Sequence, residues 1–394
     1  MRNGKPIDAV AQATKHGYVF VFDRTNGTPL FPIEYKSFPE STVPGEKAAG
    51  LQPIPTRPKP FARQLLTEDL LSPRTPEINQ WARGQLKTFR SAGQFIPLEV
   101  DEQTVVFPGF DGGAEWGGQA FDPQTGLYYV NANDLAWTGG LTPNTGGESG
   151  GALYRQFCAS CHRDDRHGSP PDTPSLIGIG DRRTHAELTN VIRQGRGRMS
   201  GAPALSQTSV NAIIQYMLTG QDVAPPAPGR GGRGTANVSP LIDNSYRFTG
   251  YRRFMDPEGF PATAPPWGTL SAINLHTGDY AWQVPLGEYP ELVAKGLRNT
   301  GSENYGGPIV TAGGLVFIGA TNADRKFRAF DKANGKLLWE TVLPGPGRAT
   351  PAAYEINGRQ FVVIATGSAS AGRGGGASAP PGAKYVAFAL GAGR

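Results

Sequence analysis

Five consecutive residues carry the clearest chemistry in this chain, Cys158-Ala159-Ser160-Cys161-His162. The Cys-x-x-Cys-His spacing is the signature by which a c-type haem is attached covalently. The two thiols are spaced to form thioethers with the two vinyl groups of one porphyrin, and the imidazole of His162 would be the proximal ligand of the iron. Cys158 and Cys161 are also the only cysteines among 394 residues. The motif predicts a haem c that transfers electrons.

The same two cysteines have three ordinary alternatives: a zinc site, a structural disulfide or a thioredoxin-type redox pair. Zinc would need further ligands at matching spacing. A redox pair would need a strand followed by a helix, which the flanking sequence does not offer. Haem is therefore the favoured interpretation.

A haem that only carries electrons usually has a second axial ligand, and Met199 is the best candidate. It lies in a polar stretch rich in glycine, where a core methionine would be out of place. Met217 instead continues an i, i+3, i+4, i+7 pattern that begins at Val210, which indicates packing on a helix face. His185 and His167 are weaker candidates. We expect His162 and Met199 to hold the iron.

Residues 147–222 have the pattern of a small helical domain around this cofactor. Thr184 and Glu187 form a capping box at the start of one helix, and a further helix is expected after Ser206. Glycine and proline mark both boundaries, and residues 223–236 have the composition of a linker. A covalently held haem would supply much of the core of so short a domain.

A different pattern recurs outside this domain. An acidic or amide residue is followed four positions later by glycine, and four positions beyond that by an aromatic or apolar residue. The first part predicts a turn between two strands, and the last residue is expected to pack between neighbouring sheets. The copies are Asp23/Gly27/Phe31, Asp122/Gly126/Val130, Asn274/Gly278/Trp282 and Asp331/Gly335/Trp339.

The spacing of the copies predicts a β-propeller with an inserted domain. The last two copies are 57 residues apart and the second and third are 152 apart. Subtracting roughly 90 residues for the helical domain and its linkers leaves one normal repeat, so we expect the insertion to lie between two blades. Blades are expected in residues 1–146 and 237–394. Residues 35–95 interrupt the first part as a long surface excursion, with one helix around residues 77–86.

Composition excludes some classes of function. The net charge of +5 is spread along the chain and the aromatic residues lie in strand-like runs, so nucleic-acid binding is not expected. No run of 18 apolar residues is present, and no transmembrane helix is predicted. The 54 Gly and 35 Pro among 394 residues suit many turns between short strands.

Three stretches of the expected blades resemble quinoprotein dehydrogenases that use pyrroloquinoline quinone (PQQ), most of all the glucose/quinate/shikimate type, here with an inserted c-type cytochrome. They are ATKHGYVFVFDR (13–24), PGFDGGAEWGG (108–118) and YGGPIVTAGGLVF (305–317). The resemblance implies a mainly β fold, namely the C-terminal part, roughly half, of an eight-bladed propeller interrupted by the all-α cytochrome domain.

The resemblance also implies site residues. Lys15 matches a lysine that family members place next to the quinone, and Asn133 matches an asparagine near the cofactor. Glu115 and Trp116 occupy a stretch that contacts the cofactor in relatives. Considered alone, a lysine before a strand is usually solvated, Asn133 could close a turn and Trp116 could be blade packing. The two weakest candidates for quinone contact are Asn304 and Tyr305.

By the same resemblance, PQQ would oxidise a sugar, polyol or alcohol with the help of Ca2+, and electrons would pass through haem c to a cytochrome or another respiratory acceptor. The catalytic aspartate and the Ca2+ ligands are expected upstream of this chain. We therefore expect a C-terminal part of a periplasmic enzyme, inactive in isolation and without a signal sequence of its own. The alternative is a non-catalytic haem c carrier on a propeller scaffold.

Overall fold

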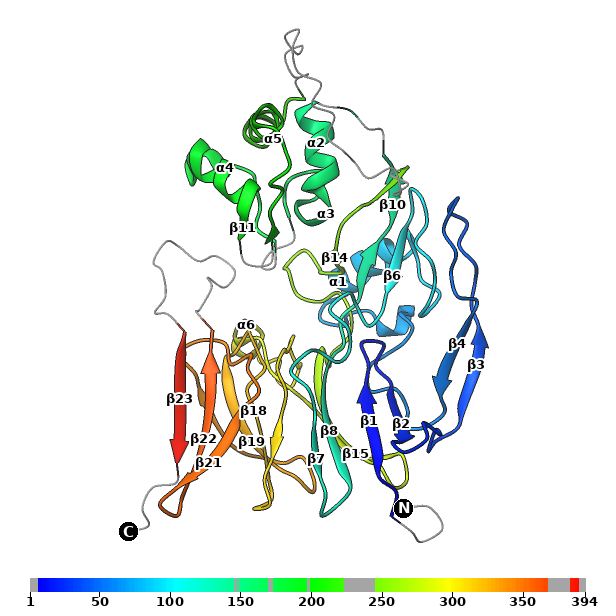
Figure 1. The fold of residues 1–394 in the computed structure, drawn as a ribbon, viewed down its shortest axis with the longest axis vertical. Helices are drawn as coiled ribbons and strands as arrows, with labels where there is room; N and C mark the ends of the chain where they lie inside the picture. The colour runs from blue at the N-terminus through cyan, green and yellow to red at the C-terminus, as the bar shows by residue number, and fades with distance from the viewer. Residues whose placement is uncertain are drawn as a thin grey trace.

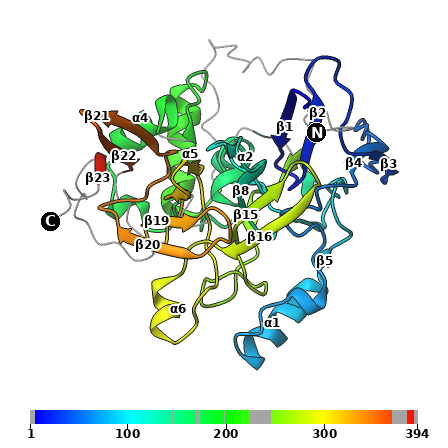
Figure 2. The ribbon, with the colours of Figure 1, turned by 90° about the horizontal axis from the view of Figure 1, so that it is seen from below.

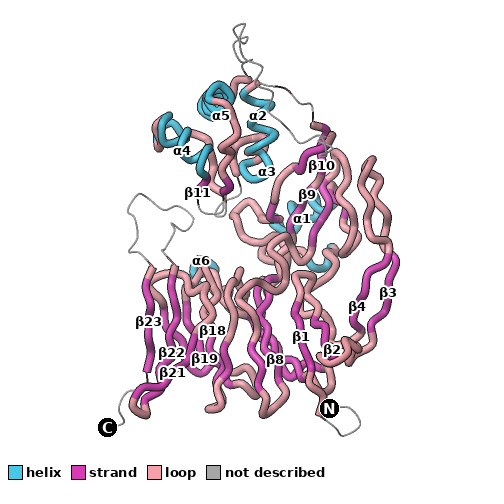
Figure 3. The backbone as a smooth tube through the Cα atoms, viewed as in Figure 1, coloured by secondary structure: helices cyan, strands magenta, loops and turns pink. Residues whose placement is uncertain are grey.

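The computed structural model describes residues 6–144, 147, 149–168, 173–196, 199–222, 245–367 and 383–389. Figure 1 shows antiparallel sheets at the end of the molecule that carries both termini, and a group of helices at the opposite end. Figure 3 shows the same division by secondary structure. The expected linker 223–236 lies outside the described residues. The prediction of a mainly β chain with a helical insertion is confirmed.

Three antiparallel sheets and one hairpin make up the end of the molecule that carries both termini. Figure 2 shows them following one another in an arc. The hairpin is β1 (Ala9–Ala13) with β2 (Val19–Asp23). The next sheet contains β7 (Ala120–Asp122), β8 (Leu127–Asn133), β15 (Gly268–Asn274) and β16 (Asp279–Pro285). Then come β17 (Ile309–Val310), β18 (Leu315–Ile318), β19 (Lys326–Asp331) and β20 (Leu337–Val342). The last sheet contains β21 (Ala352–Ile356), β22 (Arg359–Thr366) and β23 (Lys384–Ala389).

A smaller layer lies between these sheets and the helical end (Figure 1). It contains the sheet β5 (Phe89–Arg90), β6 (Gln103–Val106), β9 (Trp137–Gly139) and β14 (Arg252–Arg253), and the pair β10 (Leu141–Pro143) with β13 (Tyr246–Phe248). The remaining elements are β3 (Ile33–Ser37), β4 (Leu51–Pro55), the 3-10 helix η1 (Glu68–Leu70), α1 (Pro76–Leu86) and α6 (Pro290–Ala294). Among the described helices, none has the length and apolar character needed to span a bilayer.

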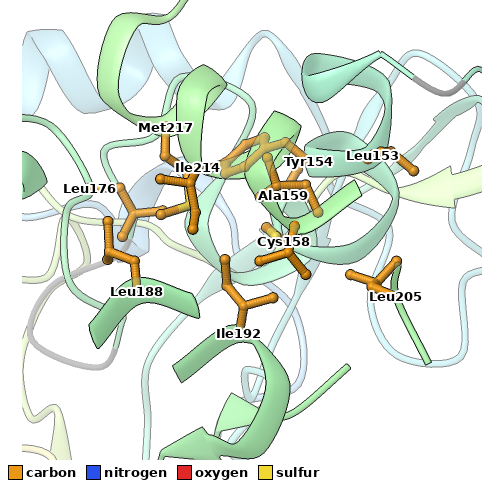
Figure 4. Packing of buried hydrophobic residues seen from close by; sticks show 12 residues of the cluster. Leu153, Tyr154, Cys158, Ala159, Leu176, Leu188, Ile192, Leu205, Ile214 and Met217 are labelled. Carbon is orange, nitrogen blue, oxygen red and sulfur yellow. The ribbon is translucent and has the colours of Figure 1, made fainter. Parts of the chain in front are cut away.

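The helical end folds around its own apolar core. Its elements are α2 (Gly150–Phe157), α3 (Ala159–His162), η2 (Ile179–Asp181), α4 (His185–Gln194), β11 (Gly195–Arg196), β12 (Met199–Ser200) and α5 (Gln207–Thr219). The capping box of Thr184 and Glu187 is present, as predicted. Figure 4 shows Cys158 and Met217 among the buried side chains, so the interpretation of Met217 as a core residue is confirmed.

The recurring pattern makes the same turn four times. In each copy the glycine amide donates to the carbonyl of the acidic or amide residue, at 2.8, 2.9, 2.7 and 2.9 Å in chain order. Each glycine has a left-handed φ, which disfavours any side chain. These angles are +73° at Gly27, +73° at Gly126, +76° at Gly278 and +73° at Gly335. The predicted turns are confirmed.

The last residue of the pattern packs against a neighbouring sheet. A Cβ atom on Gly335 would lie 2.7 Å from the ring of Trp282, so the indole of one sheet covers the turn of the next. Trp339 in turn meets Phe388 of β23, with ring centroids 5.3 Å apart. Phe31 covers Gly278 in the same way, where a Cβ would lie 3.0 Å from its ring. These contacts join successive sheets of the arc.

This packing gives a test with a matched control. Gly335→Ala places a methyl group both at a left-handed φ and against Trp282, whereas Gly27→Ala has the same φ and no atom within 4 Å. We expect Gly27→Ala to lower the free energy of unfolding by about 1–2 kcal/mol. We expect Gly335→Ala to lower it by a further 1–3 kcal/mol or so, because the added methyl overpacks the site. Urea denaturation of the two variants measures both values, and equal losses would contradict the packing argument.

The position of the insertion differs from the expected one. β8 and β15 flank residues 134–267 yet pair directly, from Leu127 with Asn274 to Asn133 with Gly268. The insertion therefore lies between two neighbouring strands of one sheet, and the prediction of an insertion between blades was wrong. The spacing argument failed because the Asp122 turn joins β7 to β8 while the Asn274 turn joins β15 to β16 of the same sheet. The second and third copies are not equivalent positions of successive blades.

The excursion 35–95 is only partly a surface feature. Its expected helix is present as α1. Five apolar side chains of the excursion are buried in the cores of the sheets: Phe61, Ala62, Leu66, Leu71 and Ala82. The amide of Phe61 donates to the carbonyl of Gly17 at 2.8 Å, which ties this segment to the β1–β2 hairpin. The prediction of a surface segment was therefore wrong for these buried residues, which the proline-rich composition did not indicate.

Candidate functional site

The haem motif forms one tight helical turn. Cys158 ends α2, and the amides of Cys161 and His162 both donate to its carbonyl oxygen, at 3.2 and 2.9 Å. Both thiols are free, Cys158 buried and Cys161 exposed. Burial, with a smaller effect from Cys161, raises the pKa of the Cys158 thiol to about 12. A reactive redox cysteine has a lowered pKa, so the environment of Cys158 disagrees with a thioredoxin-type pair.

His162 is oriented as a metal ligand. Its side chain is buried, and Nδ1 lies 3.1 Å from the carbonyl oxygen of Pro174. A carbonyl only accepts, so Nδ1 carries the proton and the lone pair of Nε2 is left for a metal. Burial also lowers the pKa of the imidazole below its ordinary value and favours the neutral, ligating form.

These residues fit haem c better than zinc. In the described ranges no group of three or more His, Cys, Asp or Glu side chains converges on one point, which a protein-bound zinc would need. Haem needs two thiols, one oriented imidazole and an apolar surrounding, and the helical end offers all three. Haem would bind through Cys158 and Cys161 with its iron on His162.

The proposed second ligand lies on a short hairpin. Met199 begins β12, pairs with Arg196 of β11 and is half-buried. Figure 1 shows this hairpin and α3 on the side of the helical end that faces the sheets. His185 and His167 are both exposed, and His167 Nδ1 lies 3.1 Å from the carbonyl of Asp165. Met199 as an iron ligand stays a prediction.

Replacing Met199 tests that assignment. Met199→Ala should remove the thioether band from the spectrum of the ferric protein and lower the haem reduction potential, because a Met axial ligand raises that potential. Met217→Leu is the matched control, since Met217 is buried in the core and a Leu of similar volume should leave both properties unchanged. An unchanged spectrum in Met199→Ala would exclude this residue as the ligand.

A second cluster gathers around Gly113, far from the haem motif in the sequence. The carbonyl of Lys15 accepts from the amide of Gly113 at 2.7 Å, and the carbonyl of Gly113 accepts from the amide of Asn133 at 2.9 Å. Lys15 Nζ donates to the carbonyl of Phe110 at 2.7 Å. Gly112 has a φ of +92°, and a Cβ there would lie 2.9 Å from Lys15. The glycine pair therefore lets the backbone close around the lysine.

Asn133 and Asn304 bind one another. Asn133 Nδ2 donates to the carbonyl of Asn304 at 2.9 Å, and the amide of Asn304 donates to Asn133 Oδ1 at 2.8 Å. Both side chains are buried, and Asn131 Nδ2 donates to Asn304 Oδ1 at 2.7 Å. This network holds β8 against the strand-free segment before β17. It also occupies part of the hydrogen-bonding capacity that a bound quinone would use.

Tyr305 leads to a charged group that the sequence did not reveal. Its hydroxyl donates to Asp111 Oδ2 at 2.8 Å, and Arg253 Nη2 lies 3.3 Å from the same oxygen. Arg253 also pairs with Glu303 and lies over the ring of Trp137, 4.8 Å from its centroid. The position of Asp111 within the 108–118 stretch, next to Gly112, could have indicated its role from the sequence. No sequence pattern marks Arg253 or Glu303.

Glu115 and Trp116 lie beside a different backbone segment. A Cβ on the following Gly117 would lie 1.9 Å from the carbonyl carbon of Gly306, directly after Tyr305. Glu115 is half-buried, and the Trp116 side chain is 69% exposed. The structure thus places the six tentative quinone residues in two adjoining groups, with Lys15, Asn133 and Asn304 in one and Glu115, Trp116 and Tyr305 in the other.

An aromatic bridge joins this region to the haem motif. We define it as Phe110, Trp137, Phe248 and Tyr251. The ring of Phe110 lies 5.0 Å from that of Tyr251, centroid to centroid. The amide of Tyr251 faces the carbonyl of Ser160 at 3.4 Å, inside the haem motif. The bridge therefore runs from Phe110, whose carbonyl accepts from Lys15, to the helix α3 that carries Ser160 between the two thiols.

The donors of the second cluster fit a quinone that carries carboxylates. The ammonium of Lys15 is exposed, and the exposed indole of Trp116 offers a flat apolar surface. Calcium is a different case. Among the described residues no three His, Cys, Asp or Glu side chains come together, so the carboxylates that calcium prefers are not gathered there.

Comparison with known protein families shows to which family this chain belongs. The family described as "Glucose/ethanol/alcohol dehydrogenase, beta-propeller domain", whose cofactor is PQQ, matches residues 1–170 and 201–362. The chain belongs to this quinoprotein family. Residues 146–217 also match "Cytochrome C oxidase, cbb3-type, subunit III", a second family that coincides with the helical end. The resemblance inferred from the three sequence stretches is confirmed, as is the pairing of PQQ with haem c.

Among curated proteins, the glycerol dehydrogenase large subunit of Gluconobacter oxydans is 30% identical over 93% of this chain and 41% of its own length. The quinate/shikimate dehydrogenase (quinone) of Acinetobacter baylyi is 28% identical over 94% of the chain and 37% of its own length. The chain thus spans about two fifths of the length of these relatives. Among solved structures, quinohemoprotein alcohol dehydrogenase from Comamonas testosteroni is 18% identical, with 98% of this chain and 36% of that chain covered and a TM-score of 0.44.

Proposed function

We propose that this chain is part of a periplasmic dehydrogenase that oxidises a CH–OH group of a sugar, polyol or alcohol with PQQ and passes the electrons to its own haem c. From the haem, electrons would leave to a cytochrome or another respiratory component. The two curated relatives named above are dehydrogenases of glycerol and of quinate or shikimate, which are hydroxylated small molecules. The coexistence of both family matches in one chain supports the two-cofactor assignment.

The aromatic bridge is the observation that carries this proposal. A haem carrier on an unrelated scaffold would have no need of contacts that lead from Lys15 to the haem motif. Here Phe110 takes part in both sites, because its carbonyl accepts from Lys15 at 2.7 Å and its ring packs 5.0 Å from Tyr251. A Cβ on Gly250 would lie only 2.9 Å from the carbonyl oxygen of Ser160, so the two backbones are in close contact.

Lys15 is the residue we assign to the quinone. Bound PQQ would supply the electrophilic carbonyl that accepts hydride. An ammonium has three donors, and the carbonyl of Phe110 occupies one of them, which leaves two for an oxygen on which negative charge develops. The backbone of Gly112-Gly113 packs against Lys15 before any ligand binds. The ammonium charge of Lys15 is therefore already in position and does not have to reorganise during the reaction.

The general base is not assigned to the described residues. Asp111 lies directly before the Gly112 turn of the site, but it is bound to Arg253 and Tyr305. We propose that the base and the Ca2+ ligands come from an additional segment, and that the chain by itself does not turn over substrate. The proposal therefore concerns the protein together with any preceding segment that its gene encodes.

Replacement of Lys15 tests the function. In protein that includes the segment supplying the base and is loaded with PQQ and Ca2+, Lys15→Ala should lower kcat for dye reduction about 10²–10³-fold, as expected for removal of one preorganised donor. Lys36→Ala is the control, since Lys36 is an exposed residue of β3. If the wild-type protein showed a reversible haem couple but no quinone-dependent spectral change, the proposal would fail in favour of a haem c carrier on a propeller scaffold.

A further inference from the structure

A cavity of about 240 Å3 opens beside the lysine. Three segments line it: Lys15-His16 at the start of the β1–β2 turn, residues 93–96 and residues 105–110. The volume is below the 300–1,000 Å3 or so that is usual for drug-sized ligands, which suits a molecule of a few carbon atoms. Its position places any such molecule against the residue that we assign to the quinone.

The wall formed by residues 93–96 is built with backbone strain. Phe95 has a φ of +56°, which is a rare conformation for an aromatic residue. The side chain of Gln94 holds the loop in place by donating from Nε2 to the carbonyl of His16 at 2.6 Å. The Phe95 ring packs against His16, with ring centroids 4.9 Å apart. Strain of this kind persists where the surrounding structure imposes it, and it clusters at ligand sites.

The chemistry of His16 suits a hydroxyl group. Partial burial and the charge of Lys15 both lower the pKa of His16, so the imidazole is neutral near pH 7. A neutral imidazole has one nitrogen that donates a hydrogen bond and one that accepts. It can therefore bind a hydroxyl group, which both donates and accepts. Among the described residues, neither ring nitrogen of His16 has a hydrogen-bond partner, since the contacts of this residue are made by its backbone carbonyl and its ring face.

We propose that this cavity, the His16–Phe95 pocket, binds the hydroxylated carbon chain of the substrate beyond the carbon that is oxidised. His16 would bind a hydroxyl, and the ring of Phe95 would cover the C–H face of the same chain. The pocket then favours polyols and sugars over monohydric alcohols. The inference rests on the proposed function, because it is that proposal which places the reacting carbon beside Lys15.

Chemical modification tests the pocket without turnover. Diethyl pyrocarbonate acylates the neutral imidazole of His16, and mass spectrometry of the quinone-loaded protein measures the rate. We expect glycerol and ribitol to slow this modification and ethanol at the same concentration to leave it unchanged. His276, an exposed histidine in the β15–β16 turn, is the internal control and should react at one rate throughout. An effect on His16 that is equal for ethanol and the polyols, or absent, would overturn the proposal.

Kinetics of three variants add a second readout. His16→Leu should raise KM for glycerol up to about tenfold, the effect of one lost hydrogen bond, with kcat and KM for ethanol unchanged. His16→Asn keeps a donor and an acceptor and should restore part of the affinity. Phe95→Asn tolerates the left-handed φ but removes the ring, and should also raise KM for polyols alone. Equal changes of KM for glycerol and ethanol would contradict the pocket.

The two proposals fail separately. Protection of His16 by polyols in a loaded protein that oxidises nothing would contradict the proposed function and leave the pocket standing. Oxidation of polyols without any protection of His16 would contradict the pocket and leave the proposed function standing.

Discussion

The double variant Cys158→Ala/Cys161→Ala should contain no covalently attached haem and should lose much of the stability of its helical end. Without thioethers nothing keeps the porphyrin in the protein under denaturing conditions. The helical end is also short, and a domain of that size has a small apolar core of its own. Haem staining after a denaturing gel and the helical circular dichroism signal on heating measure the two effects.

The control for this variant is Ser160→Ala. Ser160 lies between the two cysteines, and its hydroxyl makes only a distant contact of 4.0 Å with Cys161 Sγ. Its backbone carbonyl, which meets Tyr251, is unchanged by the substitution. We expect full haem staining and an unchanged melting temperature. A stained band in the double variant would show that the haem is held elsewhere.

Arg253→Met should cost about 3–5 kcal/mol of unfolding free energy, because it leaves the carboxylates of Asp111 and Glu303 without their buried counter-charge. The Arg253 side chain is 5% exposed, and those of Glu303 and Asp111 are 10% and 20% exposed. The loss should exceed that from packing alone, since Met restores most of the apolar volume against Trp137. Urea denaturation measures the change.

A surface pair supplies the comparison. Arg24 lies 2.8 Å from Asp8, but the two side chains are 65% and 68% exposed. Arg24→Met should therefore change the unfolding free energy by no more than about 1 kcal/mol. If Arg253→Met had as small an effect, the buried ion pairs of Arg253 with Asp111 and Glu303 would not stabilise the fold.

The haem motif and the turns could be predicted because their information is local. Five adjacent residues define the haem attachment, and five positions define each glycine turn. The same holds for Asn357-Gly358, a pair typical of two-residue hairpin turns, which joins β21 to β22 with φ values of +51° and +75°. In each case the residues that define the feature are close neighbours in the sequence.

The charged cluster could not be predicted, because its members meet only after folding. Asp111 and Arg253 are 142 positions apart, and an isolated arginine in a strand has no distinguishing neighbours. The same limit explains the error over the insertion, since strand pairing across residues 134–267 leaves no repeat in the sequence. The resemblance to quinoproteins supplied Lys15 and Asn133, but not the hydrogen bonds that already engage the asparagine.

The direct pairing of β8 with β15 has a consequence for how the protein assembles. The ends of the intervening segment, at Asn133 and Gly268, must meet before this sheet can form. Closing so long a loop costs entropy, and contacts of such high sequence separation form late in folding. Attachment of haem would compact part of that loop before the strands pair. We therefore expect attachment of haem at Cys158 and Cys161 to precede the pairing of β8, which carries Asn133, with β15.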